Sequence, residues 1–430
     1  MTTPQEPPRG GESPAERAVT KRNLVNLFLT LHLPAISIGL GMGLTAVVLP
    51  ELTKSLGQGV GAAIGVFVVY QAGTVVAPLP TGYLIDRFGR RTMLLAGPVV
   101  VAISSFLIAY VAANDGSIVQ FLAYRFIGGI GEQMWMLSRI TVIADTAPRD
   151  QRGRQITSMF GVQQFGALAG PVLGGLAAVG IGLWAPFVLH GVIVLAAMVP
   201  SFLLQRETAP PRRGAGSDAA PASSWRELLV HPIPVVFLVQ FLANVTRGGV
   251  FGGGVILIYG SFAYGLSALE LGSLRSLMAV IGIPMTFTVG YIMDRFGRKY
   301  TIVPGLALSG LAMGYLAFTW YAGLPVSYFI GGFIAIHMAV NIISGNMQTL
   351  GTDVAPPAAR GRFFGFSRLI AQSGSFLSPV SFGVLSTTAV LPFVASYTVA
   401  FAFLAGTALT ASVIVAVFIE ETLHRPPRAP

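Results

Sequence analysis

The sequence has no cysteine and few charged residues, and each absence excludes a class of protein. Without cysteine, the chain forms no disulfide bond and offers no thiolate to a metal ion. Charged residues make up only 10% of the 430 positions, whereas soluble domains carry about 25%. Apolar residues make up 53%, and the mean hydropathy is +0.71. We therefore predict an all-α protein of the lipid bilayer.

Motifs of enzymes and ATP-driven proteins are also missing. The sequence has no Gly-Lys-Ser/Thr phosphate loop and no His-Glu-x-x-His metal motif. No nucleophile–base pair stands out. Residues 1–23 are polar and lack the apolar region of a signal peptide. We expect no enzyme activity, no metal and no cofactor.

Apolar runs of about 20 residues alternate with short polar turns, which is typical of membrane helices. They predict twelve spans, at 24–50, 60–85, 92–113, 118–146, 153–180, 184–205, 233–260, 267–292, 300–321, 325–355, 362–388 and 393–419. Most Lys and Arg residues fall on one side of this topology, so both termini are predicted to be cytoplasmic. The net charge of +10 thus reflects topology and does not indicate a nucleic-acid partner.

A nine-residue motif, Gly-Tyr-x-x-Asp-Arg-Phe-Gly-Arg, occurs at 82–90 and again 208 residues later at 290–298. Asp, Gly, Gln and Pro positions elsewhere repeat at the same offset, so the chain contains two homologous halves. We predict a tail at 1–23, a six-helix bundle at 24–205, a cytoplasmic linker at 206–232, a second bundle at 233–420 and a tail at 421–430. Duplicated halves are typical of secondary transporters, in which the substrate site lies between the repeats.

The duplicated motif resembles the loop 2–3 motif of the major facilitator superfamily, and the resemblance covers nearly the whole chain. Arg125 followed by Gly128, Gly129 and Gly131 resembles the fourth-helix motif of that family. The fifth span is similar to the motif of the antiporter branch, at Gly166, Gly170, Pro171, Gly174 and Gly175. The resemblance implies a drug:proton antiporter with two pseudo-symmetric six-helix bundles.

The resemblance also implies a cytoplasmic gate, a charge network that closes that side in the outward-facing state. Its residues are Asp86, Arg90 and Asp145, with Asp294, Arg298 and Asp353 at the 208-residue offset. An arginine can bridge two carboxylates with its planar guanidinium. The alternative is that these positive charges only anchor the topology.

The fourth span carries Arg125, Glu132 and Arg139 at intervals of seven, which places them on one helix face. Ionisable groups at this depth are costly and face a cavity or a partner. We predict that Glu132 carries the coupled proton beside Arg125. A static Arg–Glu–Arg cluster is the alternative, and the spacing does not decide between the two.

In the superfamily, spans one, four, seven and ten line the central cavity. Polar residues on these spans are therefore candidates to contact substrate: His32, Arg139, Asn244, Arg247, His337, Asn341 and Gln348. Trp135, near Glu132, is a candidate to line the cavity with apolar surface. The excess of arginines favours a substrate that is anionic or zwitterionic.

We therefore predict a monomeric transporter of a bacterial inner membrane that exports a small amphipathic compound in exchange for protons. Two alternatives remain open. One is a proton symporter that imports an organic anion or a sugar. The other is an exporter of a lipid-like substrate, because a Glu directly after the fourth-helix glycines resembles spinster-type lipid exporters.

Overall fold

The computed structural model describes residues 26, 28–146, 152–205, 207, 230–251, 254–344, 346–356, 360–387 and 396–421, and its regular elements there are all helices. The predicted tail at 1–23 and nearly all of the predicted linker lie outside these residues. The first half contains η1 (Phe28–His32), α2 (Leu33–Ala46), α3 (Leu49–Ser55), α4 (Val60–Val76), α5 (Pro78–Phe88), α6 (Arg90–Ala113), α7 (Ile118–Thr146), α8 (Arg152–Gly180) and α9 (Ala185–Leu204).

The second half repeats this order with small differences. It contains α10 (Ile233–Phe251), α11 (Val255–Tyr264), α12 (Ala268–Phe296), α13 (Lys299–Tyr321), α14 (Val326–Ser344), α15 (Asn346–Val354), α16 (Arg360–Thr387) and α17 (Ser396–Phe418). The predicted seventh span is thus divided between α10 and α11. Gly254, at the start of α11, has φ of +62°, a conformation that glycine adopts without strain.

Ten spans among the described residues are long and apolar enough to cross a membrane. A further pair, α4 and α5, passes the same test as one span bent by 43°. Pro78 starts α5 at this bend, because proline lacks the N–H that would continue the ladder of α4. Helix α7 has 29 residues but is not among the ten, and it carries Arg125, Glu132 and Arg139. The predicted all-helical membrane fold is therefore confirmed.

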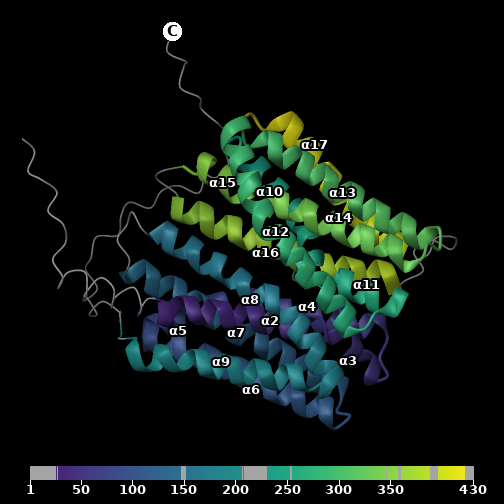
Figure 1. Ribbon diagram of the computed structural model, residues 1–430. Coiled ribbons are helices and arrows are strands. Elements are labelled where there is room, and N and C mark those ends of the chain that lie inside the picture. Colours follow the sequence, from purple (N-terminus) through teal and green to yellow (C-terminus); the bar gives the residue numbers. More distant parts are fainter. Residues whose placement is uncertain are drawn as a thin grey trace, which may run out of the picture.

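The helices form two bundles, with the first half below the second in Figure 1. Within the first bundle, α2 packs on α8 and α9, α6 on α7 and α9, and α4 on α7. The second bundle repeats these pairs with α10, α16, α17, α13, α14 and α12. The bundles meet where α8 packs on α12 and α4 packs on α16. This arrangement is pseudo-symmetric, because each of these helices takes the place of its counterpart in the other half.

Candidate functional site

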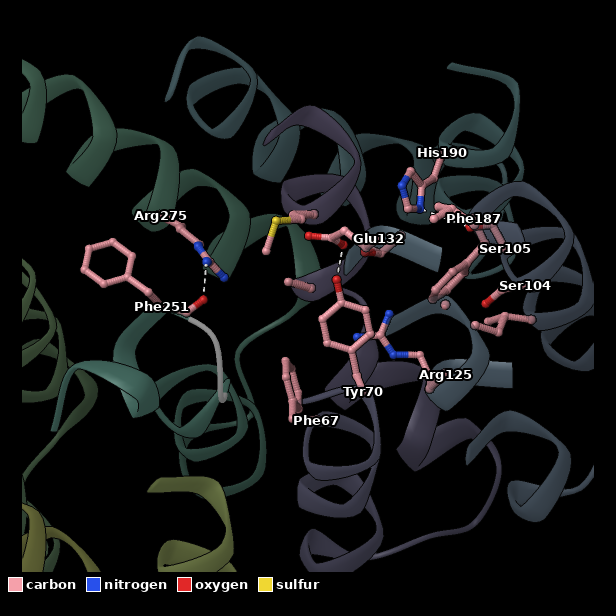
Figure 2. A pocket seen from close by; sticks show the side chains of 16 residues that line it. Phe67, Tyr70, Ser104, Ser105, Arg125, Glu132, Phe187, His190, Phe251 and Arg275 are labelled. Atoms are coloured by element: carbon pink, nitrogen blue, oxygen red, sulfur yellow. Dashed lines mark hydrogen bonds between the residues drawn. The ribbon is translucent and has the colours of Figure 1, made fainter. Parts of the chain in front are cut away.

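A cavity of about 610 Å³, its opening included, lies mainly in the first half and reaches the second half at one wall. Helices α2, α4, α6, α7 and α9 supply most of its lining, and α10 and α12 supply the rest (Figure 2). Its walls combine apolar side chains with a small set of polar groups, as ligand sites commonly do. The polar residues are Thr45, Tyr70, Ser104, Ser105, Arg125, Glu132, His190 and Arg275.

Glu132 lies on the cavity wall within a cluster of three side chains. The Tyr70 hydroxyl donates a hydrogen bond to Glu132 Oε2. The guanidinium of Arg125 lies over the Tyr70 ring, 4.3 Å from the ring centroid (Figure 2). Tyr70 therefore connects the cation to the carboxylate: its π face contacts Arg125 and its hydroxyl contacts Glu132. Sequence reasoning missed Tyr70, because one tyrosine in an apolar span has no distinguishing pattern.

Glycines of the fourth-span motif bring these groups together. A Cβ on Gly129 would overlap the backbone carbonyl of Tyr70. A Cβ on Gly131 would lie 2.9 Å from the backbone nitrogen of Val101 on α6. Only glycine permits such close approach of one helix backbone to another. The motif thus allows α7 to pack directly on α4 and α6, which places Tyr70 beside Glu132.

His190 on α9 is a second titratable group of the cavity that sequence reasoning missed. Its Nδ1 lies 3.1 Å from the Ser105 hydroxyl. The opposite edge of the imidazole ring occupies the space left by Gly41 on α2, where a Cβ would overlap the ring. The physical role of Gly41 is to make room for His190.

The second half contributes Arg275 and Phe251 to the cavity wall. The Arg275 Nη2 donates a hydrogen bond of 3.0 Å to the Phe251 carbonyl. Phe251 is the last residue of α10, so this cation lies at the negative end of the helix dipole and satisfies a free carbonyl there. Figure 2 shows Arg275 on the wall opposite the Tyr70–Arg125 pair.

Seven of the eight predicted cavity residues have described side chains, and none of the seven lines this cavity. Arg139 and Trp135 are fully buried, with the guanidinium 5.4 Å from the indole centroid. The Arg247 guanidinium lies 5.5 Å from the Phe251 ring. His337 Nδ1 donates to the Phe333 carbonyl at 2.8 Å.

The remaining predicted cavity residues have local partners. His32 Nε2 lies 2.9 Å from the Ser158 hydroxyl, and Asn244 donates to the Gln240 carbonyl at 2.7 Å. Asn341 packs against Gly282 on α12. The side chain of Gln348 lies outside the described residues. A substrate role for all eight stays a prediction.

The structure brings the charges of each duplicated motif together within its own half. Arg90 Nε contacts Asp145 Oδ2 at 3.0 Å, and Arg90 Nη1 lies 3.8 Å from Asp86 Oδ1. In the second half, Arg298 Nε contacts Asp353 Oδ2 at 3.1 Å. The side chain of Asp294 lies outside the described residues. A role of these pairs as a gate stays a prediction.

A carboxylate that sequence reasoning missed completes each motif. Glu207 accepts hydrogen bonds from the backbone N–H groups of Arg90 and Arg91 at 2.9 and 3.1 Å. Glu421 accepts from Arg298 and Lys299, both at 2.9 Å. These carboxylates satisfy the free N–H groups at the starts of α6 and α13. The sequence signal was the Glu-Thr pair that closes each half.

The fifth-span glycines form the contact between α8 and α2. A Cβ on Gly166, Gly170 or Gly174 would overlap the carbonyl oxygen of Ile36, Leu40 or Leu44, respectively. On another face of α8, a Cβ on Gly175 would lie 2.5 Å from the Cα of Leu269 on α12. The motif therefore packs against its own half and against the other half. Its antiport-specific meaning stays a prediction.

The cavity can bind a small compound and hold a proton. Its carboxylate has a hydroxyl donor and a nearby cation, while the apolar walls include Met42, Phe67 and Phe187. Within the described residues, no group of three or more His, Asp or Glu side chains is placed to hold a metal ion. The polar side chains of the wall can supply hydrogen bonding and charge pairing, and a proton role of Glu132 stays a prediction.

Comparisons with known proteins identify the family. Residues 32–379 match the sequence profile of the Major Facilitator Superfamily. The multidrug resistance protein MdtH of Aeromonas salmonicida is 26% identical over 343 residues, which cover 76% of this chain and 78% of that protein. The class C tetracycline resistance protein of Escherichia coli is 28% identical over 307 residues, which cover 69% of this chain and 73% of that protein.

Solved structures agree on the fold. The crystal structure of a D-xylose-proton symporter aligns with a TM-score of 0.72 at 18% identity, covering 93% of this chain and 98% of that one. A bacterial homologue of the iron transporter ferroportin aligns with a TM-score of 0.69 at 18% identity, covering 92% and 98%. At this identity the likeness concerns the fold alone. The family profile spans most of the chain, and the protein is therefore a multi-pass membrane transporter that belongs to the Major Facilitator Superfamily.

Proposed function

We propose that the protein exports a small amphipathic compound across a bacterial inner membrane in exchange for protons. The observation that carries this proposal is the position of Glu132, a carboxylate at membrane depth that lines a cavity and has Tyr70 as its donor. A carboxylate in such a place is a natural proton carrier. Relatives named for multidrug and tetracycline resistance support export as the direction.

Proton coupling follows from the contacts of Glu132 with two different helices. Its carboxylate is on α7, whereas its donor Tyr70 is on α4. A shift of α4 relative to α7 changes the number of donors to the carboxylate, and with it the proton affinity. Such a shift has to occur inside the first bundle, because α4 and α7 both belong to it. Rocking of the two bundles about the central site moves the second-half wall, with Arg275 and Phe251, relative to Glu132. Arg125 is on α7 with Glu132, and its guanidinium lies over the ring of Tyr70.

The lining supports an amphipathic substrate. Phe67, Phe187 and Phe251 offer apolar surface, and Arg275 offers a cation on the opposite wall from Tyr70. A substrate that spans the cavity would place its apolar body on the rings and an oxygen acceptor on Arg275. We further propose that both termini are cytoplasmic, that the protein acts as a monomer, and that the Arg90 and Arg298 pairs belong to the cytoplasmic gate.

An importer of an organic anion or sugar by proton symport is the second candidate. The observation that favours it is the pair of cavity arginines, Arg125 and Arg275, which outnumber the one cavity carboxylate. Anionic substrates gain from such an excess of positive charge.

A flux experiment separates the two candidates. Purified protein is screened by thermal shift against drugs, organic acids, sugars and lysolipids, and each hit is loaded into proteoliposomes. An imposed inward proton gradient should expel the compound if the protein is an antiporter. Accumulation of the compound inside the vesicles under the same gradient would establish symport. Flux that is independent of the proton gradient would contradict proton coupling.

A further inference from the structure

Two charged residues of α3 connect the halves at the end of the molecule opposite the duplicated motifs. Lys54 Nζ donates a hydrogen bond of 2.5 Å to the Ser261 carbonyl of α11. Glu51 Oε2 accepts a hydrogen bond of 2.8 Å from the Ala268 N–H of α12. Figure 1 shows α3 and α11 at the same end, far from α5 and α15. We propose that Glu51 and Lys54 form a clasp that holds the two halves together at this end and sets the balance between the two access states.

Each charge of the clasp matches the helix end that it contacts. Ser261 lies in the last turn of α11, where the helix dipole favours a cation, and its carbonyl accepts from both the Gly265 N–H and Lys54. Ala268 is the first residue of α12, where free N–H groups favour an anion. Glu51 and Lys54 are three residues apart, so both face the same side of α3. One short helix therefore contacts two helix ends of the other half with charges of the matching sign.

The local capping of α12 leaves a role for Glu51. Ser267 and Glu270 form a reciprocal capping box, in which Ser267 Oγ accepts from the Glu270 N–H and Glu270 accepts from the Ser267 N–H. The box does not include the Ala268 N–H, which the first half satisfies through Glu51. The contact therefore breaks whenever the halves separate at this end.

The clasp is not part of the duplicated pattern. At the 208-residue offset, Tyr259 and Phe262 occupy the positions of Glu51 and Lys54. The Phe262 ring lies under Lys54, with Nζ 4.8 Å from its centroid, which adds a cation–π contact. The charges are thus on one half, and the surfaces that receive them are on the other.

Apolar packing surrounds these polar contacts. Leu49 and Leu52 of α3 belong to one buried cluster with Val255, Leu257 and other residues of the second half. Alternating access requires this end to open, so both the apolar contacts and the clasp must separate together. The hydrogen bonds of the clasp are directional, so their energy falls steeply as the halves separate. Apolar contacts are not directional, so they persist when the surfaces slide past each other.

Distance measurements between spin labels test the clasp, because the chain has no cysteine of its own. One label pair is placed at Asn114 and Ala322, exposed positions at the clasp end. A second pair is placed at Thr92 and Tyr300, exposed positions at the opposite end. The variants are Glu51→Met, which removes the acceptor, Lys54→Met, which removes the donor, and their combination. Each distance distribution is measured by double electron–electron resonance in nanodiscs, so the test requires neither a substrate nor proton coupling.

We expect each single substitution to shift the ratio of open to closed molecules by about tenfold, the typical effect of losing a hydrogen bond to a charged group. The Asn114–Ala322 distance should lengthen while the Thr92–Tyr300 distance shortens. The matched control is Glu270→Met, which removes a hydrogen bond at the same end of α12 within one half and should leave both distributions unchanged. Unchanged distances in the clasp variants, or lengthening at both ends, would overturn the proposal.

Discussion

The close contact of α8 with α2 leads to a prediction about Gly170→Ala. A Cβ at position 170 would overlap the Leu40 carbonyl and lie 2.9 Å from the Gly43 Cα and 3.1 Å from the Leu44 nitrogen. All three are backbone atoms, which cannot rotate away as a side chain can. Overpacking of this kind costs about 1–3 kcal/mol. The helices must therefore move apart or the backbone must distort.

The matched control is Gly161→Ala on the same helix, because nothing lies within 4 Å of a Cβ there. Alanine in place of a helical glycine stabilises the helix by about 1 kcal/mol. Both substitutions have this effect, so it cancels in the comparison. The free energy of unfolding, measured at equilibrium with sodium dodecyl sulfate in mixed micelles, should thus be lower in Gly170→Ala than in Gly161→Ala by about 1–3 kcal/mol. Equal stability of the two variants would refute the account of the fifth-span motif as a backbone contact.

Two further predictions concern the charged groups. Tyr70→Phe keeps the ring under Arg125 but removes the hydrogen-bond donor to Glu132. Proton-driven flux in proteoliposomes should therefore fall about tenfold or more, as expected for loss of a charge-assisted hydrogen bond. Flux equal to that of the wild-type protein would show that the contact is not needed for coupling. Asp86→Asn should impair transport, because the proposed cytoplasmic gate includes the Asp86–Arg90 pair. Its effect on yield and thermal stability should be small, because this aspartate is 79% exposed and its 3.8 Å contact with Arg90 is a weak surface pair. Lost expression of Asp86→Asn, or unchanged transport, would count against a role in gating.

The fold was predictable from the sequence because membrane helices depend on local composition. Apolar length marked the spans, and the 208-residue repeat of Gly82–Arg90 indicated two matching halves. The family assignment is confirmed by the matching profile. The break between α10 and α11 was not predicted, although three glycines at 252–254 separate Phe251 from Val255 and glycine is a helix-breaking residue.

The site was predictable only in part, because its contacts join residues that are far apart in the chain. Helical spacing placed Glu132 and Arg125 on one face of α7, and both line the described cavity. Tyr70 and His190 occur singly in apolar spans, so no pattern pointed to them. Their roles follow from tertiary contacts. Gly129 allows the close approach of α4 that brings Tyr70 to Glu132, and Gly41 leaves the space that the His190 ring occupies.

Glu132→Gln tests the central claim most directly, because the amide keeps the size of the side chain but cannot release a proton. The variant and the wild-type protein are reconstituted side by side, and each is assayed for flux driven by a proton gradient and for counterflow exchange of the same compound. If Glu132 carries the coupled proton, gradient-driven flux should disappear while counterflow persists, since exchange needs no net proton movement. A Glu132→Gln protein that still moves its substrate against a concentration gradient at the expense of the proton gradient would contradict the account.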